Sequence, residues 1–306
     1  SELWGWDGAR RSWFVLDNDA PYFASPYTQY RMVFDGRRGV LILVGAIPEG
    51  GFKTWEWDGA SWSSKDAGGL PVDVYVDSFA LVYDEGRGVT LAHGGLYTSP
   101  STWEWDGSAW IPRPEGDGLP GRADHALAYD RRRGVVVAFG GRARSHVAKV
   151  HPVGDTWEWD GVTWSERQRT PPGQSLGHAA AYDRLREVTL AYTGTALLEW
   201  DGHAWRSISQ DGPRHLYYSR SIVFDEARGL TILFGNSYED YYRRRWETWE
   251  WDGSVWIERT IEGQPGRFGH AMTFDSVRGV TVLFGGDWQD VGLVNDLWTW
   301  NGLEWH

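Results

Sequence analysis

The 306-residue sequence contains no cysteine, and no apolar run approaches the roughly 18 residues that a membrane-spanning helix needs. Without a thiol, disulfides, thiolate metal sites and a cysteine nucleophile are excluded, and neither an oxidising nor a reducing compartment is favoured. Positive charge is also scarce, because 30 basic against 42 acidic residues give a formal net charge of -12. That balance argues against nucleic acid or an anionic membrane as the main partner. We expect a small-molecule, glycan or protein partner.

Tryptophan, in contrast, is abundant: 22 residues, most of them in a repeated W-x-W-D-G-x-x-W pattern. An Asp-Gly or Asn-Gly pair between strand-like residues predicts a tight hairpin. A second pattern is an alternating strand that ends in Tyr or Phe and then Asp, followed by a turn and a short apolar run. It occurs six times, at 32–39, 81–88, 127–134, 180–187, 222–229 and 272–279. Each unit is therefore predicted to contain four antiparallel strands.

The spacing of these units predicts the fold. The Asp or Asn of the W-x-W-D-G hairpin recurs at 58, 106, 160, 201, 252 and 301, which are intervals of 41 to 54 residues. Four strands per unit at that period predict propeller blades. We predict one all-β domain over residues 1–306, a six-bladed β-propeller, with a seven-bladed ring as the lesser alternative. An additional hairpin in residues 1–15 is expected to take part in ring closure.

The hairpin ending in F-G-G, followed by a loop and a conspicuous Trp, resembles kelch repeats. The R-x-G-H-like openings at 122–130 and 267–275 are similar to those of bacterial kelch-type sequences. The resemblance covers almost the whole chain and implies a propeller, but kelch propellers include oxidases, isomerases, lyase-like specifier proteins and binding modules. A galactose-oxidase-like copper site needs a Cys crosslinked to Tyr, and a specifier-type E-x-x-x-D-x-x-x-H iron site is missing too. We expect no cofactor and no metal.

The tryptophans are interpreted as structural. The outer hairpins contain 20 of the 22, and a residue that every blade repeats is best explained by what every blade needs. Large aromatic side chains bury roughly 150–250 Å² each, enough to fill the wide outer half of a blade. The repeated Asp and Arg of the inner turn, such as Asp35 and Arg38, are expected to pair near the surface for about 1 kcal/mol or less. Function is expected where the repeat breaks.

The first breaks are aromatic. Trp246 and Trp288 lie outside the motif, and we predict them in loops between the second and third strands of blades 5 and 6. In a propeller these loops share one side with the connections between blades, here called the loop face, and surround one mouth of the central channel. Tyr217, Tyr241 and Tyr242 are expected on the same face. The alternative is that these loops only pack on one another.

Aligning the blades on the inner-turn Asp reveals two unusual arginines. Four residues before that Asp, the equivalents of Arg31 are all small: Ala80, Ala126, Ala179, Ser221 and Ala271. A large cation there needs an anionic ligand or a salt bridge to a neighbouring blade. One position earlier, Tyr30, Phe79 and Arg220 replace a histidine. The resemblance makes that histidine, seen as His125, His178 and His270, a structural default, so a metal triad is disfavoured.

His93 replaces a large apolar residue before the glycines of blade 2. A histidine there is either an acid or base near neutral pH or a satisfied core residue, and Asp77 is the nearest carboxylate along the chain.

Together these residues predict a central pocket on the loop face with an aromatic wall of Trp246, Trp288, Tyr217, Tyr241, Tyr242, Tyr30 and Phe79. Arg31 and Arg220 supply positive charge, which favours a sugar-like or aromatic ligand with an anionic or carbonyl group. Tyr30, His93 and Asp77 suit cofactor-independent acid/base chemistry of isomerase, cyclase or lyase type. The alternatives are a non-catalytic glycan-binding module and a protein-interaction platform. The sequence assigns no compartment.

Overall fold

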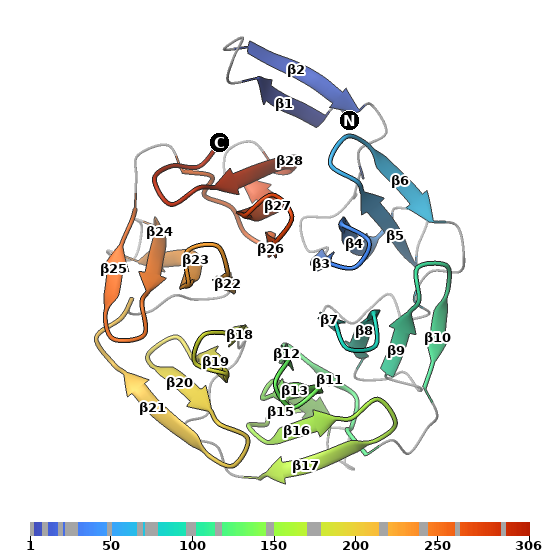
Figure 1. The fold of residues 1–306 in the computed structure, drawn as a ribbon, viewed down its shortest axis with the longest axis vertical. Helices are drawn as coiled ribbons and strands as arrows, with labels where there is room; N and C mark the ends of the chain where they lie inside the picture. Colours follow the sequence, from blue (N-terminus) through green and yellow to red (C-terminus); the bar gives the residue numbers. More distant parts are fainter. Residues whose placement is uncertain are drawn as a thin grey trace.

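The structure is a computed structural model that describes residues 3–7, 12–17, 21, 30–47, 51–65, 70, 79–95, 102–113, 118–144, 150–169, 179–213, 220–238, 244–260, 264–288 and 292–306. These residues form antiparallel strands joined by turns (Figure 1). Six sheets are arranged in a ring around a central axis, so the predicted all-β, six-bladed architecture is confirmed. Within the described ranges no helix could span a membrane.

Each blade is numbered in chain order and runs from its innermost to its outermost strand. Blade 1 consists of β3 (Arg31–Asp35), β4 (Val40–Ala46), β5 (Phe52–Trp57) and β6 (Trp62–Lys65). Blade 2 consists of β7 (Phe79–Asp84), β8 (Val89–Gly94), β9 (Thr102–Trp105) and β10 (Trp110–Pro112). Blade 3 consists of β12 (Ala126–Asp130), β13 (Val135–Phe139), β16 (Thr156–Trp159) and β17 (Trp164–Gln168).

Blade 4 consists of β18 (Ala179–Asp183), β19 (Val188–Tyr192), β20 (Leu197–Trp200) and β21 (Trp205–Ser209). Blade 5 consists of β22 (Arg220–Asp225), β23 (Leu230–Tyr238), β24 (Arg244–Trp251) and β25 (Trp256–Glu258). Blade 6 consists of β26 (Ala271–Asp275), β27 (Val280–Trp288) and β28 (Gly292–Trp300). A small sheet of β11 (Arg122–Ala123), β14 (Arg142–Arg144) and β15 (Val150–Pro152) is added at blade 3.

The ring closes between blades 6 and 1, because β26 contacts β3 just as each innermost strand contacts the next. The outer position of blade 6 is taken by the C-terminal residues, where Trp305 forms a β-bridge with Trp300. The additional hairpin, β1 (Leu3–Asp7) and β2 (Ser12–Asp17), lies outside the ring, where β1 contacts β28 (Figure 1). Its role in ring closure stays a prediction.

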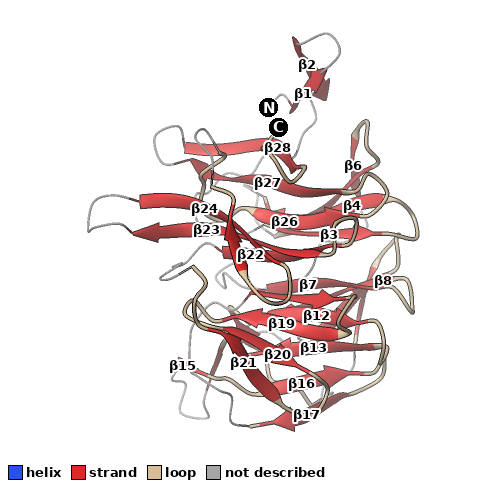
Figure 2. Cartoon of the chain, turned by 60° about the vertical axis from the view of Figure 1, so that its left-hand side comes forward, coloured by secondary structure: helices blue, strands red, loops and turns tan. Residues whose placement is uncertain are grey.

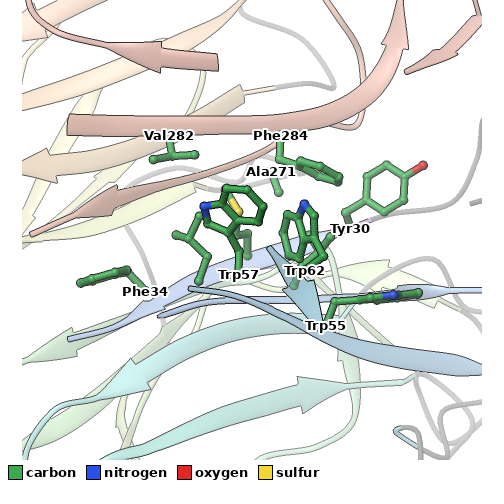
Figure 3. Packing of buried hydrophobic residues seen from close by; sticks show 11 residues of the cluster. Tyr30, Phe34, Trp55, Trp57, Trp62, Ala271, Val282 and Phe284 are labelled. Atoms are coloured by element: carbon green, nitrogen blue, oxygen red, sulfur yellow. The ribbon is translucent and has the colours of Figure 1, made fainter. Parts of the chain in front are cut away.

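The outer tryptophans hold neighbouring blades together, as predicted. The Trp105 indole N–H donates to Glu56 Oε1 of the preceding blade at 3.3 Å, and the Trp110 indole N–H donates to Thr54 Oγ1 at 2.9 Å. The same pair of bonds recurs between blades 2 and 3, 3 and 4, and 5 and 6. Between blades 6 and 1 the contact is apolar: Trp62 packs on Phe284, with ring centroids 5.4 Å apart (Figure 3). Tryptophan here builds the core.

The Asp–Arg pair of the inner turn differs from the prediction that it lies near the surface. Asp35 is buried, and it accepts from Arg38 Nε at 2.6 Å while Arg38 also donates to Glu56 at 2.7 Å. Glu56 is the carboxylate that accepts the Trp105 indole N–H. The predicted pairing is found and the Arg38 side chain is 33% exposed, but Asp35 lies deeper than expected because Arg38 also pairs with Glu56 on the third strand. The pair is part of a partly buried network that crosses to the next blade.

Candidate functional site: the loop-face end of the axial channel

The central channel contains two cavities that meet at an apolar collar. One residue from each innermost strand, three positions before the inner-turn Asp, lines both cavities: Met32, Leu81, Leu127, Ala180, Ile222 and Met272. The cavity on the loop face measures about 240 Å³. The other measures about 520 Å³ and opens on the side of the inner turns, here called the turn face.

An ionic bridge spans the channel at the turn face. Arg184 of blade 4 forms ion pairs with Glu85 of blade 2 and with Glu226 of blade 5. Arg131 approaches Glu85 as well, at 3.6 Å. Burial raises the pKa of Glu226, and the charge of Arg184 opposes that shift. The bridge lies on the far side of the collar from the smaller cavity.

The loop-face cavity has an uneven polar wall. Most blades contribute alanine or glycine, as at Ala80, Ala126, Ala179, Gly269 and Ala271. The same wall also contains six larger polar side chains from blades 1, 3, 5 and 6: Tyr30, Arg31, Asp124, His125, Arg220 and His270. Three of the predicted site residues, Tyr30, Arg31 and Arg220, therefore line the same cavity.

Arg31 is held in a fixed orientation. It begins β3 opposite Val44, and its Nε donates to the Phe79 carbonyl of blade 2 at 2.9 Å. One terminal nitrogen donates to the Tyr30 carbonyl, also at 2.9 Å. Burial lowers the pKa of Arg31 to about 10, against the opposing charge of Asp124. The guanidinium is therefore still charged at neutral pH.

Arg220 reaches the cavity from the other side of the ring. It begins β22 opposite Gly235, and its guanidinium carbon lies 5.9 Å from the ring centroid of Tyr192 in blade 4. Burial lowers its pKa to about 10 as well, so it too is a cation at neutral pH. Such a contact between a cation and an aromatic face contributes about 0.5–2 kcal/mol and orients the guanidinium.

Asp124 is the lining residue that sequence reasoning missed. Its φ is 55°, in the left-handed region that Gly269 occupies at the equivalent position of blade 6 with φ 65°. Non-glycine residues adopt this conformation rarely, although Asp does so more readily than most. Its carboxylate accepts from Arg142 Nε at 2.6 Å. The signal was Asp in place of Gly in the R-x-G-H opening, a departure that marks functional sites when strain is retained.

His93 and His270 are buried, neutral at pH 7 and held by contacts within the protein. His93 is fully buried, its Nδ1 lies 3.2 Å from His125 Nε2, and it does not line the cavity. Burial, aided by the charge of Arg122, lowers the pKa of His93 to about 3. His270 Nδ1 lies 3.0 Å from the Arg267 carbonyl, and burial lowers its pKa to about 4. Among the residues that the structure describes, no group of three His, Asp or Glu could hold a metal.

Of the predicted aromatic wall, Tyr30 lines the cavity, whereas Trp246 is found elsewhere. Trp246 lies on β24 paired with Asn236, not in a loop, and it packs between Phe234 and Phe268 at centroid distances of 6.0 and 5.1 Å. The loop assignment was wrong because the β23–β24 pair continues past the motif; Figure 2 shows this pair projecting from the ring. Trp246 thus belongs to the packing between blades 5 and 6.

Of the other predicted site residues, Phe79 is buried against Phe52 at 5.2 Å, also off the cavity wall. Trp288 is the last residue of β27, paired with Gly292, so its predicted loop position is corrected too. The remaining predicted residues lie outside the described ranges: Asp77, Tyr217, Tyr241 and Tyr242.

Comparison with known proteins finds similarity to solved structures and none to a family model or a curated sequence. No family model matches the chain, and no curated protein matches it in sequence. The structure of YjhT aligns with 94% of this chain and 99% of its own at 12% identity and a TM-score of 0.66. The Aleuria aurantia lectin, a fungal six-bladed β-propeller with a fucose recognition mode, covers 94% and 96% at 13% identity and a TM-score of 0.63. The chain has the six-bladed β-propeller fold.

A third similar structure is the SapL1 lectin in complex with α-methyl fucoside. It covers 92% of this propeller and 95% of its own chain at 14% identity and a TM-score of 0.56. Identities this low show the fold alone. What this propeller binds must therefore be argued from its own cavity.

Proposed function

We propose that this propeller binds a small sugar in the loop-face cavity, without turnover. The observation that carries the proposal is the wall of that cavity, where charged and polar side chains from four blades converge on the axis. At the position of Arg31, other blades place small residues such as Ala126 and Ala271. Six-bladed lectins that recognise fucose or fucosides support the proposal, because they use the same fold for a ligand of this class.

The size of the cavity favours a ligand no larger than one sugar ring. Drug-sized ligands occupy pockets of about 300–1,000 Å³. At about 240 Å³ the loop-face cavity falls below that range. The apolar collar surrounds its inner end, so we place the remaining units of a longer oligosaccharide toward the loop face.

The chemistry of the wall favours recognition by hydrogen bonds over aromatic stacking. Within the described part of the wall, Tyr30 is the only aromatic side chain other than the two histidines, and it is 2% exposed. Arginine presents up to five N–H donors in a fixed geometry, and a carboxylate such as that of Asp124 accepts from hydroxyl groups. A polyhydroxylated ring offers partners to both.

Acid/base catalysis is left out of the proposal. His93 is separated from the cavity by His125, and its pKa of about 3 leaves it neutral and weakly basic. Efficient proton transfer needs a group that reaches the substrate and titrates near the working pH.

The kelch character of the repeat stays part of the proposal, supported by the F-G-G and R-x-G-H-like signatures.

The test is calorimetric titration of monosaccharides, including L-fucose, into the wild type and two variants. The repeat supplies substitutions that the fold already accepts: Arg31→Ala copies Ala126, and Arg220→His copies His270. Arg169→Gln removes an equal charge from a side chain that is 85% exposed and distant from the cavity lining, and serves as the control.

We expect saturable binding of at least one monosaccharide, unchanged in Arg169→Gln and weakened in both cavity variants. Binding that survives in the Arg31→Ala, Arg220→His double variant would place the sugar elsewhere on the propeller. The absence of binding by every sugar in the panel would refute the function itself. Product analysis of the same mixtures detects turnover, which the proposal does not expect.

A further inference from the structure

The charges around the loop-face cavity are unbalanced. Arg31 and Arg220 both line it, and in the described part of the wall Asp124 is the sole carboxylate. Asp124 already accepts from Arg142, whose own charge offsets it. Among the residues that the structure describes, the lining thus contains two cations and one anion, in a chain whose formal net charge is -12.

The two cations are anchored on opposite walls. Arg31 donates to carbonyl groups of blades 1 and 2, whereas the guanidinium of Arg220 lies over Tyr192 of blade 4. Blades 1 and 2 face blades 4 and 5 across the ring (Figure 1). A single group on the axis is thus placed between two fixed guanidinium groups. Asp124 of blade 3 lies on one flank of that axis and His270 of blade 6 lies on the other.

We propose that the ligand is a monoanionic sugar acid, such as a hexuronate, whose carboxylate lies on the axis between Arg31 and Arg220. The proposal rests on the sugar-binding function above and names its ligand class. Arginine binds carboxylates through short, charge-assisted hydrogen bonds, which are roughly twice as strong as neutral ones. The ring hydroxyls then face Asp124 and the imidazoles of His125 and His270.

The guanidinium groups of Arg31 and Arg220 are preorganised to bind such an anion. Both guanidinium groups are already oriented by the protein, so binding orders little that was mobile. Burial disfavours both cations, which is the cause of their lowered pKa, and a carboxylate between them offsets that cost. Asp124 limits the charge of the ligand, because a second negative group would meet its carboxylate.

The experiment compares sugars that differ only in the charged group. D-galacturonate, D-galactose and methyl D-galacturonate are titrated into the wild type by calorimetry at low ionic strength, with a ring-sulfated D-galacturonate as the cyclic dianion. Arg31→Ala, Arg220→His and the Arg169→Gln control are titrated in the same way. Cyclohexanecarboxylate serves as a carboxylate without sugar hydroxyls. A parallel set with D-glucuronate and D-glucose covers the other ring configuration.

We expect a hexuronate to bind roughly tenfold or more tightly than its neutral sugar and its methyl ester, and more tightly than the dianion. The preference should be lost in Arg31→Ala and in Arg220→His, retained in Arg169→Gln, and reduced by added salt.

The two proposals fail in different ways. Equal affinity for the acid, the ester and the neutral sugar would overturn the sugar-acid proposal while leaving the sugar-binding function standing. Binding of neither acid nor neutral sugar would overturn both. Cyclohexanecarboxylate binding as tightly as a hexuronate would also overturn both, because the sugar hydroxyls would then contribute nothing.

Discussion

Removing one hydroxyl group tests whether the indole hydrogen bonds hold the blades together. Thr156 is fully buried in blade 3, and its Oγ1 accepts the indole N–H of Trp205 in blade 4 at 2.7 Å. Thr156→Val replaces that oxygen with a methyl group of nearly equal size. The indole N–H is then buried without an acceptor, which costs about 1–3 kcal/mol. We expect the free energy of unfolding to fall by that amount.

The chain offers a matched control for this substitution. Thr90 is as buried as Thr156, but its hydroxyl has no hydrogen-bond partner, and blade 3 has Val136 at the equivalent position. Thr90→Val makes the same chemical change, but it leaves no hydrogen-bond donor without an acceptor. We expect it to be neutral or to stabilise by up to about 1 kcal/mol, because a buried unpaired hydroxyl is itself unfavourable.

Both variants are measured by equilibrium unfolding in urea, with an unchanged dependence on denaturant as the sign that only stability has shifted. Equal losses in Thr156→Val and Thr90→Val would show that the methyl group, and not the lost acceptor, is responsible. No loss in Thr156→Val would refute the argument that these bonds stabilise the ring.

Two further substitutions test how buried titratable groups affect the free energy of unfolding, and both are measured as a function of pH. His93→Phe, which copies Phe139 of blade 3, should flatten the decline of stability on acidification. The pKa of His93 is lowered to about 3 from an unfolded value near 6.5, so the unfolded state binds more protons between these pH values. Stability therefore falls as pH decreases through that window, by up to about 1.4 kcal/mol per pH unit for this group; an unchanged slope in the variant would contradict the assignment. Arg184→Ala should cost about 1–3 kcal/mol at pH 8, because it leaves Glu226 half-buried without the charge of Arg184, and less at acidic pH, where protonation removes the charge of Glu226. Arg132→Ala, whose side chain is 65% exposed and pairs with Glu187 at 3.1 Å, is the control and should cost about 1 kcal/mol or less at either pH.

The fold could be predicted because its determinants are local and repeated. In the outer turn of blade 1, Asp58 Oδ1 accepts from the backbone N–H groups of Ala60 and Ser61, and the same W-D-G signature marks the equivalent turns. The destination of the indole N–H groups could not be predicted, because Thr54 and Glu56 precede their partners by about one blade. Repeats reveal a unit; contacts between units depend on how the ring packs.

The same distinction explains which site residues could be found. Arg31 and Arg220 lie on or next to the innermost strands, whose side chains reach the axis, so their departure from the repeat was informative. His93 departs equally clearly, but it lies on the second strand, where side chains pack between blades. Trp246 was misplaced because the extension of a strand pair depends on its partner and not on a motif.

Asp124 shows what a comparison of side chains leaves out. When the blades are compared by the size and charge of their side chains, Asp124 is only a polar residue beside a histidine. When they are compared by backbone conformation, Asp124 occupies a position where blade 6 uses Gly269 at a φ of 65°. A built Cβ at Gly269 meets nothing within 4 Å, so the space there accepts a side chain, and the backbone is the remaining obstacle. Blade 3 accepts the strain of an Asp at 55° and gains a carboxylate on the axis. In a sixfold repeat, a pocket that distinguishes one end of a ligand from the other needs such departures, and Arg31, Asp124 and Arg220 supply them from alternate blades.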